Sequence, residues 1–159
     1  MSVKKENIYE AGSPLTRGLN FLLVDDDDIC LFIHRRVLEL SGYCRSARSA
    51  VSGRNALEIL THLTNGDSPV PDIIFLDLEM PNMNGIEFLE AFQSLDFVHK
   101  ESIAIVLLTS SVCEKDKQYA VSLGVAHYLT KPLTLDALHS VVNSLYNCKP
   151  PLPVMIPCH

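Results

Sequence analysis

Long hydrophobic runs are absent from the sequence. No apolar stretch approaches the ~20 residues that a helix needs to cross a bilayer, and the polar amino-terminal segment lacks the apolar core of a secretory signal. We therefore expect a cytoplasmic protein with no membrane-spanning segment. Basic clusters are scarce too: the formal net charge is -6, and no Lys/Arg cluster exceeds the pairs "KK" at 4–5 and "RR" at 35–36. Neither a nucleic acid nor an anionic membrane is expected as the main partner.

Cysteine and histidine spacings typical of metal sites are also missing. The five cysteines are odd in number and widely spaced, and none forms a CxxC pair or a Cys/His ligand pattern. The histidines are scattered, and His34 lies in an apolar helical pattern, where packing or solvation is its ordinary role. We therefore expect neither a disulfide framework nor a zinc site, and we interpret the cysteines as inert thiols.

The chain has the length and composition of one folded domain. It has 159 residues, of which 47% are hydrophobic and 20% charged, which is enough for a substantial core. Residues 1–17 lack a sustained periodicity and contain a Gly-Ser-Pro breaker, which predicts a flexible arm. Residues 148–159 are rich in proline, which predicts an extended tail. The folded domain is expected over residues 18–147.

Short apolar runs alternate with helical patterns along this domain. The clearest runs cover residues 19–24, 72–76, 103–108 and 125–129. Because they lack in/out alternation, they predict strands that are buried on both faces, as in a parallel sheet. A further strand, second along the chain, is expected within residues 43–50, where the pattern is weak. This alternation predicts a doubly wound α/β domain with right-handed crossovers.

The run "DDDD" at 25–28 joins the first strand to a predicted helix. We expect Asp28, with Asp27 as the alternative, to cap a helix that starts at Ile29, because an acid there accepts backbone N–H bonds and complements the helix dipole. Apolar side chains at helical spacing line one stripe of this helix. They are Ile29, Ile33, Val37 and Leu40.

Polar side chains collect where the predicted strands end. They are Asp25 and Asp26 after the first strand, Asp77 after the third, Thr109 and Ser110 after the fourth, and Thr130, Lys131 and Pro132 at the fifth. Ligands bind outside the carboxyl ends of the strands in an open parallel sheet. The three carboxylates would repel one another, and a divalent cation together with Lys131 would balance them. Mg²⁺ fits, because it takes one or two carboxylates, waters and phosphate oxygens. Taken singly, each of these residues is better interpreted as a solvated turn or surface residue, and only the set as a whole favours a site.

The segments "LLVDDDD", "DIIFLDLEMPNMNGIEFL", "IVLLTSS" and "HYLTKPL" resemble, in order and spacing, the receiver domain of two-component response regulators. The resemblance covers roughly residues 19–147. It implies a flavodoxin-like, three-layer sandwich with a five-stranded parallel sheet in the order 2-1-3-4-5. In that order the first and third strands are neighbours, which would place the acidic pair beside Asp77.

The resemblance also assigns the phosphorylation site. Asp77 matches the aspartate that accepts a phosphoryl group from a sensor histidine kinase or a histidine phosphotransfer protein. Asp25 and Asp26 match the acidic pair that holds Mg²⁺, and Asp77 and the backbone carbonyl of Glu79 are expected to complete the protein ligands. Lys131 matches the lysine that contacts the phosphoryl group.

Three further positions carry family roles. Thr109 matches the switch hydroxyl that bonds a phosphoryl oxygen, and Tyr128 matches the aromatic position that turns inward with it. Pro132 matches a proline whose peptide bond with Lys131 is cis. The implied protein is a stand-alone receiver with no output domain. It is not an enzyme beyond its own phosphorylation and dephosphorylation, and its output passes to a downstream protein target or into onward phosphotransfer.

Other functions compete with the receiver. A haloacid-dehalogenase-like, Mg²⁺-dependent phosphatase also uses a strand-end aspartate with an acid two residues later, as in "DLE" at 77–79, but its nucleophile normally follows the first strand. A flavodoxin-like cofactor binder requires a phosphate-binding loop after the first strand, but the four aspartates at that place would repel phosphate. A receiver-shaped domain that binds partners without phosphorylation is the third alternative.

Overall fold

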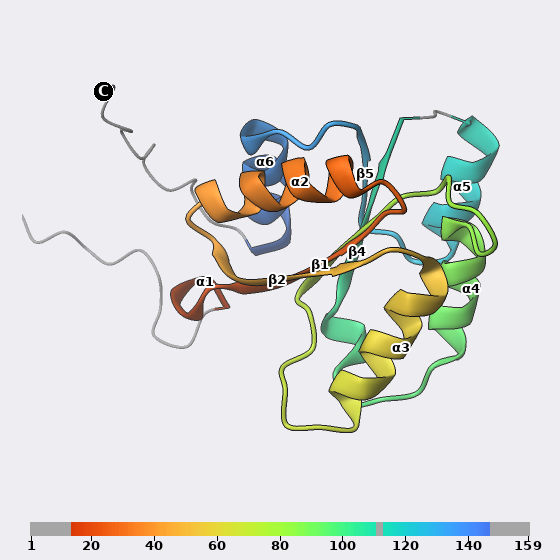
Figure 1. The fold of residues 1–159 in the computed structure, drawn as a ribbon, viewed down its shortest axis with the longest axis horizontal. Coiled ribbons are helices and arrows are strands. Elements are labelled where there is room, and N and C mark those ends of the chain that lie inside the picture. Colours follow the sequence, from red (N-terminus) through yellow and green to blue (C-terminus); the bar gives the residue numbers. More distant parts are fainter. Residues whose placement is uncertain (1–13, 111–112, 147–159) are drawn as a thin grey trace, which may run out of the picture.

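The chain folds into a three-layer α/β sandwich around one parallel sheet (Figure 1). The computed structural model describes residues 14–110 and 113–146. The sheet order is β2-β1-β3-β4-β5, and every strand pair is parallel. Its strands are β1 (Leu19–Val24), β2 (Cys44–Ala50), β3 (Ile73–Leu76), β4 (Ala104–Thr109) and β5 (His127–Thr130). The predicted fold class and strand order are confirmed, including the weakly patterned second strand.

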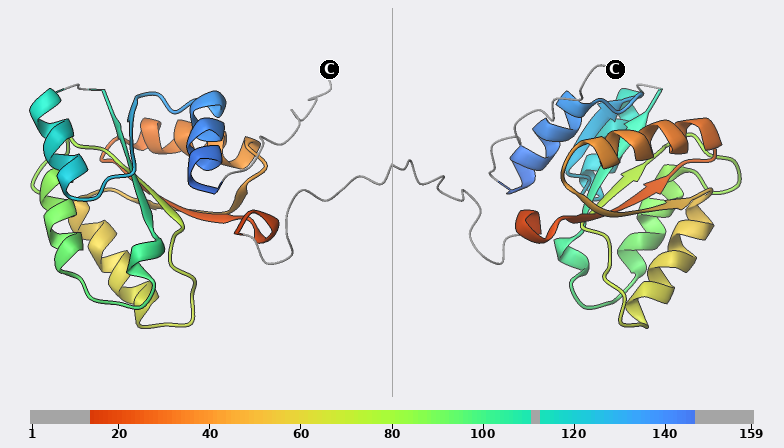
Figure 2. Two further views of the ribbon diagram at one scale, coloured as in Figure 1. Left: turned by 180° about the vertical axis from the view of Figure 1, so that it is seen from behind. Right: turned by 60° about the vertical axis from the view of Figure 1, so that its left-hand side comes forward.

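Helices cover both faces of the sheet. They are α1 (Pro14–Arg17), α2 (Asp28–Leu40), α3 (Gly53–Thr64), α4 (Gly85–Ser94), α5 (Glu114–Ser122) and α6 (Leu135–Tyr146), with a short 3-10 helix at Lys100–Ser102. Helices α2 and α6 lie on one face, and α3, α4 and α5 lie on the other (Figures 1 and 2). Among the helices described, none is long and apolar enough to span a bilayer.

The core is divided by the sheet into two hydrophobic clusters. Alternate side chains of β1 enter opposite clusters: Leu22 and Val24 pack on the α3–α5 side, and Phe21 and Leu23 pack on the α2–α6 side. All six residues of β1 are buried, as are all four of β3. Burial on both faces therefore explains why these strands read as continuous apolar runs.

Of the apolar stripe predicted on α2, only Val37 packs against the core. The buried residues of this helix are Leu31, His34 and Leu38, whereas Ile29 is 71% exposed and Ile33 is 43% exposed. Apolar residues occur at helical spacing on two sides of α2, so periodicity alone could not decide which stripe faces the sheet. The side that packs against β1 and α6 includes a histidine, which concealed it in the sequence.

The N-cap of α2 is Asp27, the predicted alternative, and not Asp28. Helix α2 begins at Asp28 rather than Ile29, and the Asp27 carboxylate accepts hydrogen bonds from the backbone N–H groups of Ile29 (2.8 Å) and Cys30 (3.3 Å). These bonds lower the pKa of Asp27, that from Cys30 most strongly. Asp28 lies in the first helical turn, where an acid still complements the dipole.

Polar contacts tie the amino-terminal end of the domain to Asp72, which lies just before β3. Arg17 of α1 pairs with Asp72 at 2.6 Å, and Asp72 also accepts the backbone N–H of Asn20 at 2.7 Å. Ordered contacts thus begin just before the predicted domain boundary at residue 18. The predictions for the rest of the arm and for the proline-rich tail fall on residues 1–13 and 147–159, outside the described residues.

Alkaline pH should destabilise the fold through Tyr146. Burial, reinforced by the Asp72 carboxylate, raises the pKa of Tyr146 from 10.0 to about 12. The stability linked to its protonated phenol is complete below the unfolded pKa of ~10 and is lost as pH rises through the folded pKa. We expect Tyr146→Phe to remove about 2 kcal/mol of this pH dependence. Urea midpoints of both proteins between pH 9 and pH ~12 test this; parallel pH curves would contradict it.

Candidate phosphorylation site

The sheet itself brings two acids together. Val24 and Leu76 are paired in the register of β1 and β3, and Asp25 and Asp77 are the residues that follow them. The Asp77 N–H donates to the Val24 carbonyl at 2.9 Å, which continues the ladder beyond the last paired residues. Parallel strands end at the same edge, so these carboxylates lie side by side although 52 positions separate them in sequence.

A third carboxylate completes an acidic cluster at this edge. Oxygen atoms of Asp25, Asp26 and Asp77 all lie within 4.8 Å of one another. Asp25 and Asp77 are only 3% and 5% exposed, whereas Asp26 is exposed. Crowded carboxylates with one side open to solvent are the donor set that a hard divalent cation such as Mg²⁺ takes. The residues present therefore fit the predicted metal.

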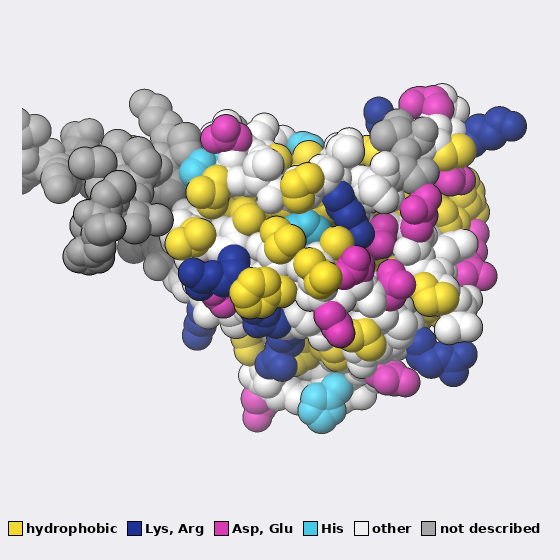
Figure 3. All heavy atoms as spheres, turned by 45° about the horizontal axis from the view of Figure 1, so that its top comes forward, with side chains coloured by type: hydrophobic (Ala, Val, Ile, Leu, Met, Phe, Trp, Pro, Cys, Tyr) yellow, Lys and Arg dark blue, Asp and Glu magenta, His cyan; other side chains and the backbone are white. Residues whose placement is uncertain are grey.

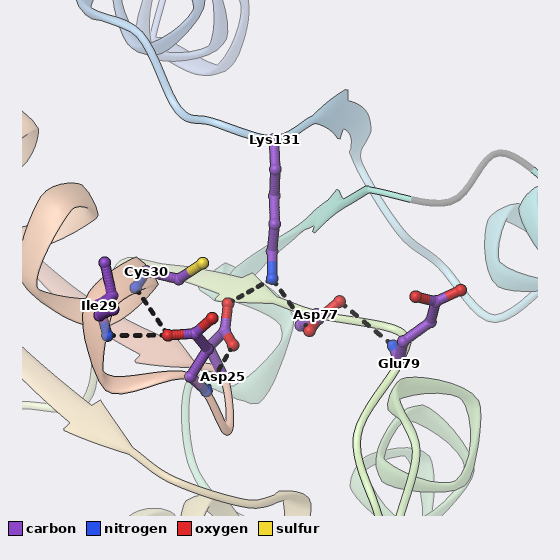
Figure 4. Close-up of polar contacts among 7 residues, drawn as sticks. Asp25, Ile29, Cys30, Asp77, Glu79 and Lys131 are labelled. Atoms are coloured by element: carbon purple, nitrogen blue, oxygen red, sulfur yellow. Dashed lines mark hydrogen bonds and ion pairs between the residues drawn. The ribbon is translucent and has the colours of Figure 1, made fainter.

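Lys131 lies between the two buried acids. Its Nζ is 2.6 Å from Asp25 Oδ2 and 3.0 Å from Asp77 Oδ2, and the side chain points into the site from the end of β5 (Figure 4). Burial alone would lower the pKa of Lys131, but its hydrogen bonds and charge interactions with the two carboxylates outweigh burial and raise it. The Lys131–Pro132 peptide bond is cis, as the resemblance implies.

Asp77 is electrostatically distinct from an ordinary surface carboxylate. Burial raises the pKa of Asp77, although Lys131 and the backbone N–H of Glu79, which donates to Oδ1 at 3.2 Å, act in the opposite direction. The Glu79 side chain is exposed and extends away from Asp77 (Figure 4). The backbone carbonyl of Glu79 stays a predicted metal ligand.

Of the two predicted switch residues, Thr109 is the last residue of β4 and Tyr128 lies within β5. Thr109 is fully buried at the end of β4, and its carbonyl accepts the Lys131 N–H at 2.9 Å. Tyr128 is partly buried against the core of the α3–α5 face, and the Lys117 ammonium lies 5.4 Å from its ring centroid. Burial raises the pKa of Tyr128. Ser110 and Thr130, the other predicted strand-end residues, are exposed.

The loop after Asp77 has features that the sequence reading left unassigned. Asn84 and Glu87 form a reciprocal capping box that starts α4. A Cβ on Gly85 would lie 2.6 Å from the Asp77 carbonyl oxygen and 2.8 Å from Leu78 Cα, so only glycine permits this approach. In the sequence, the "NG" of "MPNMNG" was the signal that could have indicated this helix start and close approach.

His34 is a further residue beside the site that no sequence motif indicated. Its side chain is 2% exposed and lines a small cavity together with Asp25 and Asp77.

Comparison with protein families decides the assignment of this arrangement. The model of the response regulator receiver domain matches residues 21–143, most of the folded domain. The chain belongs to the response-regulator receiver family. This family serves two-component phosphorelay signalling, and its members bind Mg²⁺ in an acidic pocket of the kind formed by Asp25, Asp26 and Asp77.

Individual relatives agree with this receiver assignment. A solved two-component response regulator from Cytophaga hutchinsonii is 32% identical, with a TM-score of 0.75, and the match covers 82% of this chain and 99% of that one. A protein-glutamate methylesterase/protein-glutamine glutaminase of Treponema pallidum is 32% identical over 78% of this chain and 29% of its own length. A sensor histidine kinase, CheAY, of Helicobacter pylori is 32% identical over 87% of this chain and 16% of its own.

The curated relatives are larger proteins. This receiver chain spans less than a third of the length of either one, so their methylesterase and kinase activities describe those whole proteins. Receiver domains in general are signal transducers that interact with histidine kinases and with downstream targets. No comparison supports the haloacid-dehalogenase-like alternative.

Proposed function

We propose that this receiver accepts a phosphoryl group on Asp77 from a histidine kinase or a histidine phosphotransfer protein. The observation that carries the proposal is the nearly buried Asp77 carboxylate, 3.0 Å from Lys131 Nζ and within 4.8 Å of two more carboxylates. Phosphoryl transfer needs positioning and neutralisation of oxygen charge more than covalent assistance. A bound Mg²⁺, held by Asp25, Asp26 and Asp77, would supply part of that neutralisation.

The transfer exchanges one phosphorus bond for another. An Asp77 carboxylate oxygen forms a bond to phosphorus while the bond between phosphorus and the donor's imidazole nitrogen breaks, and its electron pair returns to that nitrogen. The Lys131 ammonium then moves its hydrogen bonds toward the phosphoryl oxygens. Thr109, at the end of β4, supplies a hydroxyl for another phosphoryl oxygen, and Tyr128 follows it inward. These movements alter the surface around Thr109 and Tyr128, and the altered surface changes the binding of a downstream protein. Alternatively, the phosphoryl group is passed on to another protein.

A small-molecule acyl phosphate tests the chemistry without a protein donor. The receiver is incubated with acetyl phosphate, with Mg²⁺ or with a chelator, and its intact mass is recorded. A single phosphoryl adduct that requires the divalent cation is expected. Steady consumption of the acyl phosphate and of simple phosphate esters, with no adduct, would favour the phosphatase instead.

The exposed side of α2 gives the protein donor a place to dock. Ile29, Phe32 and Leu40 are 71%, 66% and 46% exposed, and hydrophobic side chains gather over this helix (Figure 3). Exposed apolar patches of this kind mark interaction surfaces. The patch begins at the helix end that adjoins Asp25 and Asp27, beside the place where a donor would present its phosphohistidine to Asp77.

Phe32→Asp should therefore slow transfer from a protein donor. A charge placed in an apolar contact commonly costs 2 kcal/mol or more, so we expect a loss of at least about tenfold. Phosphorylation by acetyl phosphate should be unchanged. Val98→Asp is the matched control, because Val98 is 76% exposed but follows α4 at the opposite edge of the sheet. Equal losses in both variants, or none in Phe32→Asp, would contradict docking on α2.

A further inference from the structure

Helix α5 has little hydrophobic packing to hold it against the rest of the domain. Ala120 is its only buried residue, and Tyr119 and Val121 are 46% and 58% exposed. Its N-cap residue, Cys113, makes no side-chain capping hydrogen bond. A short helix with so little apolar burial depends on other contacts for its position, and elements of this kind are the ones that move in switching proteins.

Two hydrogen bonds tie the carboxyl-terminal half of α5 to α4. The Tyr119 hydroxyl donates to Glu90 Oε1 at 2.7 Å, and Gln93 Nε2 donates to the Leu123 carbonyl at 2.6 Å. The bond to Glu90 raises the pKa of Tyr119, as expected for a phenol that donates to a carboxylate. We call these two bonds the α4–α5 latch.

The latch is attached to a firmly held element. Helix α4 buries Phe88, Leu89 and Phe92 in the core and carries the capping box at its start. At its end, Lys100 Nζ donates to the carbonyls of Gln93 and Leu95 at 2.7 and 2.6 Å. The latch therefore holds α5 against a helix that is itself fixed in the core. Breaking the latch would release α5 and leave α4 in place.

Beside the opposite end of α5, the described part of the chain leaves a hollow. A hollow of about 260 Å³ separates the start of this helix from the loop after Asp77, and it is lined by Leu78, Glu79, Met80, Asn84, Ile86, Cys113 and Asp116. Glu79 lies two residues beyond Asp77, and Thr109 precedes the start of α5 by only five positions. Helix α5 is therefore held at its far end and has room to move at the end nearest the site.

We propose that the α4–α5 latch holds α5 in the low-activity position and so limits how readily Asp77 is phosphorylated. This rests on the proposed function. A displacement of α5 into the hollow belongs to the conformation that the phosphoryl group stabilises, and the latch opposes it. Coupling between the two events is reciprocal, so a latch that disfavours the displaced conformation also disfavours phosphorylation.

Tyr119→Phe tests the latch, because it keeps the ring and removes the donor. The rate of phosphorylation by acetyl phosphate with Mg²⁺ should rise about two- to tenfold, the range that one net hydrogen bond supplies. Amide hydrogen exchange in residues 115–122 of the unphosphorylated protein should accelerate. Glu90→Ala should behave in the same way, whereas Glu90→Gln, which keeps an acceptor oxygen, should stay near the parent rate. Gln93→Ala breaks the second bond independently.

The outcomes separate the two proposals. A parent protein that forms no adduct would overturn both. A normally phosphorylated parent whose Tyr119→Phe and Gln93→Ala variants react no faster would overturn the latch alone, even if exchange in α5 accelerates. Faster phosphorylation in Glu90→Gln equal to that in Glu90→Ala would also overturn it, since the lost charge rather than the lost bond would then be responsible.

Discussion

Asp77→Asn should abolish phosphorylation by acetyl phosphate. The amide cannot replace the carboxylate as the nucleophile, so we expect the adduct to fall by on the order of a thousandfold or more, below detection by intact mass. None of the neighbouring acids should substitute, because Asp25 and Asp26 would remain occupied as ligands of Mg²⁺. Intact mass after a fixed incubation, with Mg²⁺ present, makes the measurement.

The loss in Asp77→Asn should not reflect unfolding. Burial raises the folded-state pKa of Asp77 above its ordinary 3.8. The stability linked to its neutral form is therefore complete below the unfolded pKa and is lost as pH rises through the folded value. At neutral pH the ionised group is unfavourable in the fold, and a neutral asparagine should be tolerated. Urea unfolding of the variant without Mg²⁺ should give a midpoint no lower than that of the parent.

Asp28→Asn is the matched control for this variant. Asp28 belongs to the same acidic run as Asp25, is exposed, and lies in the first turn of α2, outside the acidic cluster. It should take up one phosphoryl group at the parent rate. An undiminished adduct on Asp77→Asn, or an equal loss in Asp28→Asn, would contradict the assignment of Asp77.

The location of the site could be predicted from the ends of the strands. Asp25, Asp77 and Lys131 each follow or close an apolar run, and the general rule for open parallel sheets collects such residues at one edge. Periodicity does not state which strands are neighbours, so the pairing of β1 with β3, and with it the contact between the first two acids, depended on the family order. The register of Val24 and Leu76 shows that pairing directly.

The orientation of α2 shows where sequence reasoning stops. Ile29 and Ile33 form as good an apolar stripe as the side that is buried, and the buried side includes His34. Which stripe faces the sheet is set by packing against β1 and α6, a tertiary property. An apolar stripe left in solvent is then informative in itself, because it indicates a surface that another molecule covers.

The α4–α5 latch could not have been predicted from the sequence. Glu90 and Tyr119 are 29 positions apart, on helices whose relative placement depends on β4 between them. The residues of α5 are mostly polar, and the helix ends shortly before Gly124, which has a positive φ of 90°. Its weak packing follows from that composition, but the particular bonds that hold it follow only from the fold.

Lys131→Met should make the stability of the receiver strongly dependent on a divalent cation. Lys131 is the cation within salt-bridge distance of Asp25 and Asp77 in the described part of the chain. Without it, two buried carboxylates face each other uncompensated, and removing one partner of a buried ion pair typically costs 3–5 kcal/mol. We expect a loss of about 3 kcal/mol in chelator, measured by urea unfolding, and a clear recovery in millimolar Mg²⁺, because the cation neutralises the same two groups.

Phosphorylation of Lys131→Met should not recover with stability. In the proposed mechanism the ammonium stabilises charge on the transferring phosphoryl oxygens, and a methionine cannot do so, so we expect a rate at least about 100-fold below the parent even in saturating Mg²⁺. Lys115→Met, on the exposed side of α5, is the control and should change neither quantity. A variant as stable as the parent in chelator would show that Asp25 and Asp77 do not need Lys131 as their counter-ion. A variant that regains the parent rate in Mg²⁺ would show that the lysine acts on the fold and not on the phosphoryl group.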